Sequence, residues 1–282
     1  MKILLTGGNG MLGRTLRRQW RDFDVISTDL PDADITDAAG IDKIISDARP
    51  DAVVHCAAMT AVDKCESEKE TAYRLNAFGS GNVAAACYRH HVRLIAISTD
   101  YVFDGYFDRP YHEFDNANGG NTVYGQTKFA GEELIRRYMP NHVIARISWL
   151  YGPGGPSFVH TMMALADGSH PELKVVNDQI GNPTSTLAVA DGLKSILLAP
   201  EVVGTVHLTC EGEATWFDFA NEIFRLAGKK QKVVPCKTRE FPRPAPRPAN
   251  SRLEKRMLKF YGLPAMPDWH EALEVFMTQE RF

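Results

Sequence analysis

Tyr124 and Lys128 are the residues whose types and spacing most directly suggest proton-transfer chemistry. They lie four positions apart in NTVYGQTKFAGEEL, residues 121–134, and a helix would place both side chains on one face. A free phenol has a pKa of about 10, so a tyrosine needs help to exchange a proton near neutral pH. A lysine ammonium one turn away favours the phenolate and lowers that pKa, which makes Tyr124 a candidate general acid. Gly125 would let a cofactor or substrate approach the backbone.

A hydroxyl that could act together with Tyr124 is found at the end of an apolar run. RLIAIST predicts a strand that ends in STDYVFDG, residues 98–105. Ligands of doubly wound sheets bind beyond the carboxyl ends of the strands, so Ser98, Thr99 and Asp100 would face a cleft. Alone, a strand-end hydroxyl usually bonds local backbone groups, and Y-x-x-x-K is common in surface helices. Together, Thr99 and Tyr124 could donate two hydrogen bonds to one carbonyl oxygen and stabilise the negative charge that develops on it.

A glycine-rich turn supplies the third component. TGGNGMLGR, residues 6–14, follows the apolar run KILLT and opens a helix-like segment. Gly7 would allow the tight turn, Gly10 would let the backbone approach a pyrophosphate, and Gly13 would let the helix pack closely on the strand. Its position at the start of a strand–helix series predicts a nicotinamide dinucleotide site.

The choice between NADPH and NADH stays open in the sequence. Asp29 ends the run DVISTD, where a carboxylate can accept hydrogen bonds from the adenosine ribose, although a surface aspartate that begins a turn explains it equally well. Arg14, beside the glycine turn, could instead pair with a 2′-phosphate. Ala57 and Ala58 would let the third strand end lie against a flat cofactor. His55 lies within that apolar strand and is expected to be a buried, hydrogen-bonded histidine rather than a metal ligand.

The elements that must position these residues follow a strand–helix alternation. Strands are predicted over residues 2–7, 24–29, 52–57, 93–99 and 142–149, and helices over 11–20, 38–48, 69–90 and 128–138. This pattern predicts an α/β, Rossmann-type, doubly wound parallel sheet with a smaller C-terminal substrate-binding lobe. The dinucleotide-binding domain would span 1–150, with 187–210 returning to it. Residues 151–186 and 211–282 would form the lobe, in which the helix 216–229 buries apolar residues and the proline-rich 241–250 is a loop.

Composition excludes several other classes of protein. The 282 residues are 44% hydrophobic, enough for a large core, and carry a formal net charge of −3 with no long run of either sign. Nucleic acid and membrane surfaces are therefore not expected partners. The five cysteines are scattered without a C-x-x-C pair, which fits the reducing cytoplasm, and no run is long enough for a signal peptide or a bilayer span. No metal cluster is predicted.

Over its whole length the sequence resembles the extended short-chain dehydrogenase/reductases, and within them the dTDP-4-dehydrorhamnose reductases. The resemblance rests on TGGNGMLGR, AAMTAVDKCE, STDYVFDG and VYGQTKFAGE, and it continues through RISWLYGPGG, VVNDQIGNPT and PRPAPRPANSRL. It implies NAD(P)H-dependent reduction of the 4-keto group of dTDP-4-dehydro-L-rhamnose to dTDP-L-rhamnose, for surface polysaccharide. A homodimer is compatible with it.

The resemblance also implies roles for individual residues. Thr99, Tyr124 and Lys128 would form the catalytic set, and Lys128 would also hold the nicotinamide ribose. The dinucleotide would further contact Gly7, Gly10, Met11, Leu12, Asp29, Asp34, Ile35, Ala57, Ala58, Met59 and Thr60. The deoxysugar would meet Thr99, Asp100 and Trp149, and Arg247 and Ser251 would lie near the nucleotide sugar.

Departures from the family pattern leave alternatives open. Sugar-nucleotide 4,6-dehydratases carry Thr-Asp-Glu where this chain has Thr99-Asp100-Tyr101, which favours reduction over dehydration. The family usually has a proline shortly before the catalytic tyrosine, whereas this chain has GGNTVY. The absence of that proline would loosen the loop that presents Tyr124. Arg243 and Pro246 stand where threonine and a second arginine are common in the family. Some members bind magnesium through acidic residues on the helix where this chain has only Asp191, so no magnesium site is predicted. Reduction or epimerisation of another nucleotide sugar, or a non-catalytic regulatory subunit, are the alternatives.

Overall fold

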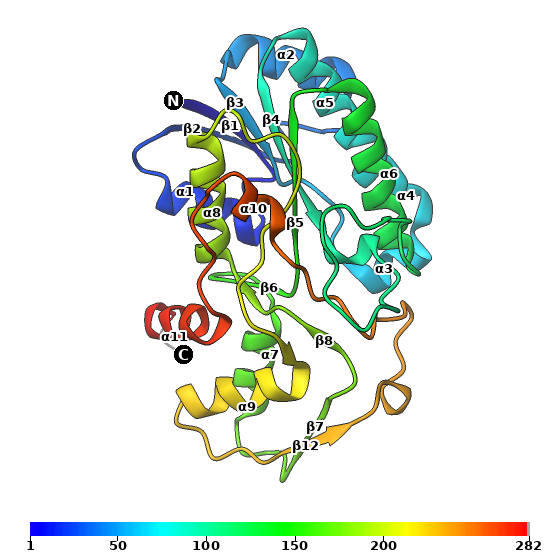
Figure 1. Cartoon of the computed structure of the whole chain (residues 1–282), viewed down its shortest axis with the longest axis vertical. Helices are drawn as coiled ribbons and strands as arrows, with labels where there is room; N and C mark the ends of the chain where they lie inside the picture. Colours follow the sequence, from blue (N-terminus) through cyan, green and yellow to red (C-terminus); the bar gives the residue numbers. More distant parts are fainter. Residues whose placement is uncertain (281–282) are drawn as a thin grey trace.

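A six-stranded parallel sheet forms the centre of the computed structural model, which describes residues 1–280 (Figure 1). The strand order is β10-β5-β4-β3-β1-β2. The bounds are β1 Lys2–Thr6, β2 Asp24–Thr28, β3 Ala52–His55, β4 Arg93–Thr99, β5 His142–Ile147 and β10 Gly204–His207. The first five are the strands predicted from the sequence. The edge strand β10 lies within 187–210, the segment predicted to return to this domain, and it pairs with β5 in parallel.

Helices cover both faces of this sheet (Figure 1). One face carries α2 (Ala38–Ala48), α5 (Ser80–Arg89) and α6 (Val123–Tyr138), and the other carries α1 (Met11–Gln19) and α8 (Thr186–Leu198). Alternate residues of each strand enter two separate apolar clusters, as the two-residue period of a strand requires. All four residues of β3 are buried, which is why its sequence lacks polar alternation.

The segment between β3 and α5 differs from the single helix predicted over 69–90. It contains α3 (Val62–Ser67), α4 (Lys69–Tyr73) and a π-helical turn, η1 (Arg74–Gly79), before α5 begins. A π turn inserts an extra residue into the helical ladder and is common near functional sites. A short 3-10 helix, η2 (Asp100–Val102), likewise follows β4 directly.

Most of the remaining elements pack below the sheet in Figure 1, whereas α10 lies beside the edge strand β10. The helices are α7 (Phe158–Leu165), α9 (Trp216–Leu226), α10 (Arg256–Phe260) and α11 (Trp269–Gln279), with a 3-10 turn η3 (Thr238–Glu240). The paired short strands are β6 (Leu150–Tyr151) with β9 (Thr184–Ser185), β7 (Leu173–Val176) with β12 (Val233–Cys236), and β8 (Ile180–Gly181) with β11 (Ala214–Thr215). One apolar cluster runs from Leu5 of β1 through Leu193 of α8 to Phe276 of α11.

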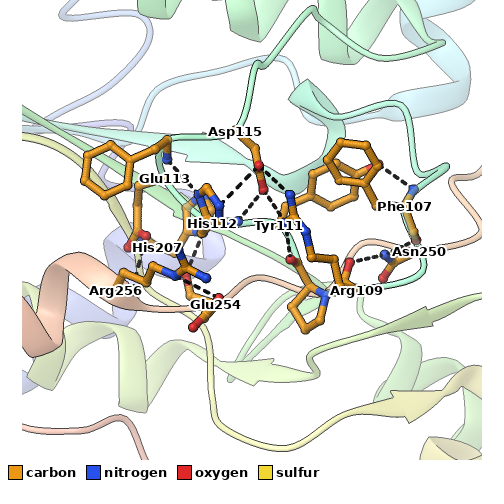
Figure 2. A network of polar contacts seen from close by, with 12 residues as sticks. Phe107, Arg109, Tyr111, His112, Glu113, Asp115, His207, Asn250, Glu254 and Arg256 are labelled. Atoms are coloured by element: carbon orange, nitrogen blue, oxygen red, sulfur yellow. Dashed lines mark hydrogen bonds and ion pairs between the residues drawn. The ribbon is translucent and has the colours of Figure 1, made fainter.

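The segment 250–256 joins this lower group to the loop 107–115 that follows β4 (Figure 2). Tyr111 and Leu253 form a parallel bridge, and the Glu254 backbone N–H donates to the Tyr111 carbonyl at 2.7 Å. The Asn250 amide donates to the carbonyls of Phe107 and Arg109 at 2.7 and 2.8 Å. These bonds fix the backbone beside Asn250 next to the carboxyl end of β4.

Candidate active site

A cavity of about 670 Å³ opens at the carboxyl ends of β1, β3, β4 and β5. The strands β2 and β3 flank β1 on opposite sides, so the chain reverses direction across the sheet here, which is where α/β sheets bind ligands. All the predicted site residues line this cavity except Met59, Arg247 and Ser251. Those that do are Gly7, Gly10, Met11, Leu12, Asp29, Asp34, Ile35, Ala57, Ala58, Thr60, Thr99, Asp100, Tyr124, Lys128 and Trp149.

The glycine turn has the geometry needed to receive a pyrophosphate. Gly7 has φ of +72°, and a Cβ there would lie 2.6 Å from the Ala57 nitrogen. A Cβ on Gly13 would lie 2.3 Å from the Gly7 carbonyl oxygen, so α1 can approach the turn only with glycine at 13. Gly10 is the N-cap of α1 and provides no side-chain cap. The first-turn N–H groups and the positive end of the helix are therefore open to an anion, and a dinucleotide fits this turn.

Arg14 lies beside this turn, and its side chain is used within the protein. Its Nη1 donates to the Asn9 carbonyl at 2.7 Å and its Nη2 donates to the Gly154 carbonyl. The guanidinium thus ties the glycine turn to the loop after β6. Arg14 does not line the cavity. Asp29, which directly follows β2, and Asp34, in the loop after it, both do.

Thr99, Tyr124 and Lys128 converge on the other end of the cavity. The Thr99 hydroxyl donates to Asp100 Oδ1 at 2.9 Å, accepts from the Tyr101 backbone N–H at 3.2 Å, and shares a hydrogen bond with the Tyr124 hydroxyl. Lys128 is 7% exposed, and its Nζ donates to the Ile97 carbonyl at 2.8 Å. A phenol, a hydroxyl and an ammonium therefore meet within one enclosed space.

The electrostatics of this set differ from the sequence prediction in one respect. Burial raises the pKa of the Tyr124 phenol above its ordinary value of 10, and the hydrogen bond with Thr99 opposes this only in part. Lys128 is not among the groups that lower the Tyr124 pKa, because its ammonium is directed at the Ile97 carbonyl of β4. Burial in turn lowers the pKa of Lys128 to about 8. Tyr124 is consequently protonated near neutral pH, the state that a proton donor needs.

Asp100 is a buried carboxyl at the same point. It is 3% exposed, and its Oδ2 has no hydrogen-bond partner among residues 1–280. Burial raises the pKa of Asp100 to about 7, with Thr99 and Ser251 acting in the opposite direction. A carboxyl that is half protonated near pH 7 can both donate to and accept from a ligand hydroxyl.

The N-terminal turn of α6 is firmly held, although the expected proline is missing. The Thr122 hydroxyl caps the helix by accepting from the Gly125 N–H at 2.9 Å, and Glu66 accepts from the Val123 N–H at 2.9 Å. The predicted loosening of this loop is therefore wrong. A Cβ on Gly125 would lie 2.2 Å from the Tyr101 carbonyl oxygen, so η2, rather than a ligand, is what comes close to this glycine.

Trp149 forms the wall of the cavity facing the lower group of elements. Its backbone has φ of +44°, which is rare for a bulky residue and typical of strained functional positions. Its indole N–H donates to the Ser251 hydroxyl at 3.0 Å, and its ring stacks on Trp216 with centroids 3.5 Å apart. Ser251, delivered by the segment described above, therefore positions Trp149 although it does not line the cavity.

Arg247 lies outside the cavity lining and pairs with Asp63 of α3. Its two Nη atoms donate to the two Asp63 oxygens at 2.9 and 3.0 Å. This bidentate pair ties the proline-rich loop to the segment after β3. Met59 also lies outside the lining, and its backbone N–H and carbonyl are both bonded to the Asn76 side chain, at 2.7 and 3.1 Å.

A buried ion pair supports the site from behind. Glu132 of α6 accepts from Ser98 at 2.6 Å and from Arg146 at 2.9 and 2.7 Å. Burial alone would raise the Glu132 pKa, but the Arg146 charge and hydrogen bonds outweigh it and lower this pKa to about 2. The pair links β4 and α6, which carry Thr99 and Tyr124, to β5, which ends two residues before Trp149.

His55 is buried and hydrogen-bonded, as predicted. Its ring contacts the hydroxyls of Thr6 and Ser80 at 2.7 and 3.0 Å, and burial lowers its pKa to about 3. Among residues 1–280, no group of three His, Cys, Asp or Glu side chains is placed to hold a metal ion. No helix in the same range is long and apolar enough to cross a membrane.

Three residues at the site were missed by sequence reasoning. Tyr101 lines the cavity, and its ring meets that of Tyr124 edge-on, with centroids 5.5 Å apart; its place directly after Asp100 was the available signal. Asn76 stands within a helical run where asparagine is unfavourable, which indicates a local bonding role. Trp216 was predicted to be core, and it does pack against the core, but its ring also stacks on Trp149.

Comparisons with known proteins agree with this geometry. The family model described as the RmlD substrate binding domain matches residues 1–282. The dTDP-4-dehydrorhamnose reductase of Escherichia coli K12 is 38% identical, with 99% of this chain and 98% of that protein covered. The spore coat polysaccharide biosynthesis protein SpsK of Bacillus subtilis is also 38% identical over 99% of this chain and 98% of its own length.

A solved structure gives the same result. The dTDP-4-dehydrorhamnose reductase of Bacillus anthracis, in complex with NADP, superposes with a TM-score of 0.95 at 37% identity, covering 99% of each chain. Both the fold and the full length of the sequence therefore lead to one assignment. The chain belongs to the RmlD substrate binding domain family.

Proposed function

We propose that this protein is an NAD(P)H-dependent oxidoreductase that reduces the 4-keto group of dTDP-4-dehydro-L-rhamnose to dTDP-L-rhamnose. The observation that carries the proposal is the convergence of Tyr124, Thr99 and Lys128 in one cavity with a glycine turn able to receive a pyrophosphate. Full-length relatives named for this activity support the choice of substrate. When bound, NADPH or NADH would supply the hydride.

Tyr124 is the proton donor in this proposal. Its phenol is protonated near neutral pH because burial raises its pKa, so it can deliver a proton to the ketone oxygen as the alcohol forms. Thr99 adds a second hydroxyl beside the phenol and would share the negative charge that develops on that oxygen. Its own bonds to Asp100 and to the Tyr101 N–H hold the Thr99 hydroxyl in place.

Lys128 contributes a buried positive charge. Its ammonium is directed at the Ile97 carbonyl and does not lower the Tyr124 pKa, so its role in this proposal is to hold the cofactor. The bond from Nζ to the Ile97 carbonyl uses one of its three protons and leaves two for ligand hydroxyls, such as those of a nicotinamide ribose. The cofactor would otherwise lie along the predicted residues that line the cavity, which are Gly7, Gly10, Met11, Leu12, Asp29, Asp34, Ile35, Ala57, Ala58 and Thr60.

The deoxysugar would lie between Asp100 and Trp149. The free Oδ2 of Asp100 can bond a sugar hydroxyl, and the face of the indole can pack on the sugar ring. Trp149 is held by Ser251 and Trp216, so the lower group of elements would set the width of this part of the cavity. Arg247 would act indirectly, by fixing the proline-rich loop through Asp63.

The division of labour follows from this placement. Residues 1–150 with 187–210 would bind the dinucleotide, and 151–186 with 211–282 would bind the nucleotide sugar. The parallel pairing of β10 with β5 supports the return of 187–210 to the dinucleotide-binding domain.

A cytoplasmic location is supported by five free cysteines. Exposed aromatic side chains on neighbouring helices, Phe78, Tyr88 and Tyr138, make a homodimer through this face the assembly to test by light scattering.

The deciding experiment follows nicotinamide absorbance with dTDP-4-dehydro-L-rhamnose. Tyr124→Phe should lower kcat by at least ~10²-fold, the usual effect of removing a positioned proton donor, with dinucleotide affinity retained. Tyr73→Phe, on an exposed tyrosine of α4, is the matched control and should keep full activity. Equal rates for Tyr124→Phe and wild type would refute the assignment of the donor.

Two further outcomes would select an alternative function. Faster turnover of a GDP- or UDP-linked ketosugar would indicate a reductase or epimerase of another nucleotide sugar. Tight dinucleotide binding without turnover of any nucleotide sugar would indicate a non-catalytic regulatory subunit.

A further inference from the structure

The segment 179–184, whose sequence is QIGNPT, holds the backbone of Trp149 although none of its residues lines the cavity. The Thr184 N–H donates to the Trp149 carbonyl at 3.2 Å, and the Ser148 hydroxyl donates to the Asn182 carbonyl at 2.8 Å. These two bonds fix the backbone of Trp149 at its φ of +44°. They therefore also fix the direction in which the indole leaves the main chain.

The same segment fixes Trp216, the residue on which Trp149 stacks. The side chain of Gln179 is buried. Its Oε1 accepts from the Trp216 indole N–H at 3.0 Å, and its Nε2 donates to the Thr238 hydroxyl at 2.9 Å. The planes of the two indoles are 4° apart and their centroids are separated by 3.5 Å, which is van der Waals contact. The Trp149 ring therefore has no room to move toward Trp216.

Gly181 lies against the edge of the Trp149 indole. It is buried in β8, opposite Ala214 of β11. A Cβ at position 181 would lie 2.5 Å from the indole Cε2, 2.6 Å from Nε1 and 2.7 Å from the Ser251 Oγ. Carbon atoms in contact are normally about 3.5 Å apart, so a side chain here would displace the indole by about 1 Å. That displacement would also break the bond between the indole N–H and Ser251.

The requirement for glycine at this position is steric. Gly181 is not among the glycines with a positive φ, so other residues could adopt its backbone conformation. What they lack is space, because the two groups that a Cβ would meet first are the Trp149 indole and the Ser251 hydroxyl. Both groups are already held by other contacts, Trp149 by Trp216 and Ser251 by its backbone N–H, which donates to the Ile180 carbonyl at 2.8 Å.

We propose that Gly181 is a positioning residue for the nucleotide sugar, because its lack of a side chain lets the Trp149 indole lie between Trp216 and Ser251 as the cavity wall. This inference rests on the proposed function in that Trp149 contacts the sugar. A displacement of about 1 Å in a group that places a substrate can lower the rate by about 10²-fold. Gly181→Ala should therefore lower kcat/KM for the nucleotide sugar by about 10²-fold. Most of the loss should appear in KM, because the wall contacts the sugar in the ground state as well as in the transition state.

A double-mutant cycle tests whether the effect passes through the indole. Nicotinamide absorbance with dTDP-4-dehydro-L-rhamnose gives kcat and KM for wild type, Gly181→Ala, Trp149→Ala and the double variant. In the Trp149→Ala background there is no indole to displace, so Gly181→Ala should change kcat/KM by less than about 2-fold. The affinity for the dinucleotide, measured by titration calorimetry, should be the same in all four proteins. An equal loss from Gly181→Ala in both backgrounds would overturn the inference.

Gly192→Ala is the matched control for crowding. A Cβ at position 192 in α8 would lie 2.6 Å from Leu208 Cδ1 and 3.1 Å from Met266 Sδ, and none of these three residues lines the cavity. This variant should lower stability but leave KM for the nucleotide sugar unchanged. A rise in KM as large as that of Gly181→Ala would show that overpacking anywhere in the core has this effect, and the inference would be wrong.

Circular dichroism of the ligand-free protein tests the indole position without any substrate. Stacked indoles couple electronically, so wild type and Gly192→Ala should show an exciton signal that Gly181→Ala loses. An unchanged signal in Gly181→Ala would overturn the inference, whereas the absence of sugar turnover by wild type would refute the proposed function alone. If Gly181→Ala does not fold, the double variant with Trp149→Ala should fold, and failure of both would show that the Cβ meets something other than the indole.

Discussion

Replacing Asp100 by asparagine should change how stability depends on pH. Burial raises the pKa of Asp100 from 3.8 to about 7, so between these values the folded protein holds a proton that the unfolded chain has released. The free energy of unfolding then falls as pH rises, by about 1.4 kcal/mol per pH unit from this group. Between pH 5 and its folded pKa of about 7, Asp100 should cost the wild type roughly 3 kcal/mol. Asparagine keeps an oxygen that can accept from Thr99 and has no proton to lose.

The measurement is urea unfolding of the ligand-free protein at pH 5 and pH 8. The unfolding free energy of Asp100→Asn minus that of wild type should be roughly 3 kcal/mol more positive at pH 8 than at pH 5. Asp22→Asn is the control. Its pKa is lowered, chiefly by the hydrogen bond from Lys194, so it titrates below pH 5 and its effect should be equal at both pH values. A constant difference for Asp100→Asn as well would refute the buried, protonated carboxyl.

Two further predictions concern the residues that flank the proton donor. Because burial lowers the pKa of Lys128 to about 8, kcat/KM should fall as pH rises through this value; a profile that stays flat to pH 10 would show that the ammonium is not required. Glu132→Gln should lower the free energy of unfolding by about 3 kcal/mol, since it leaves the buried charge of Arg146 without its partner. Urea unfolding near neutral pH checks this, and a loss below about 1 kcal/mol would contradict it.

The sequence predicted the parallel sheet and one side of the site because both follow from short-range patterns. Apolar runs such as Ala52–His55 indicate strands directly, and the glycines at 7, 10 and 13 indicate a turn whose close contacts leave no room for a Cβ. Thr99 and Tyr124 were predicted to meet because the strand–helix order places both at the carboxyl edge of the sheet.

The other side of the site could not be read from such patterns. The stacking of Trp149 on Trp216 and the bond from Trp149 to Ser251 join residues far apart in the chain, through strands only two residues long. The Tyr124 pKa was predicted to be lowered, because the spacing from Lys128 shows that both lie on one face but not where the ammonium points. Its bond to the Ile97 carbonyl is a tertiary contact that only the packing of α6 on β4 creates.

The pairing of Tyr111 with Leu253 has a consequence for how the protein is made. During synthesis the glycine turn and Tyr124 leave the ribosome long before the residues that complete the cavity wall, since Ser251 follows Tyr124 by more than a hundred positions. Until then the loop 107–115 lacks the backbone partners that it finds at 250–256. A nascent chain can thus form strands of the sheet early, but it acquires a binding-competent cleft only after residues 250–256 have been synthesised.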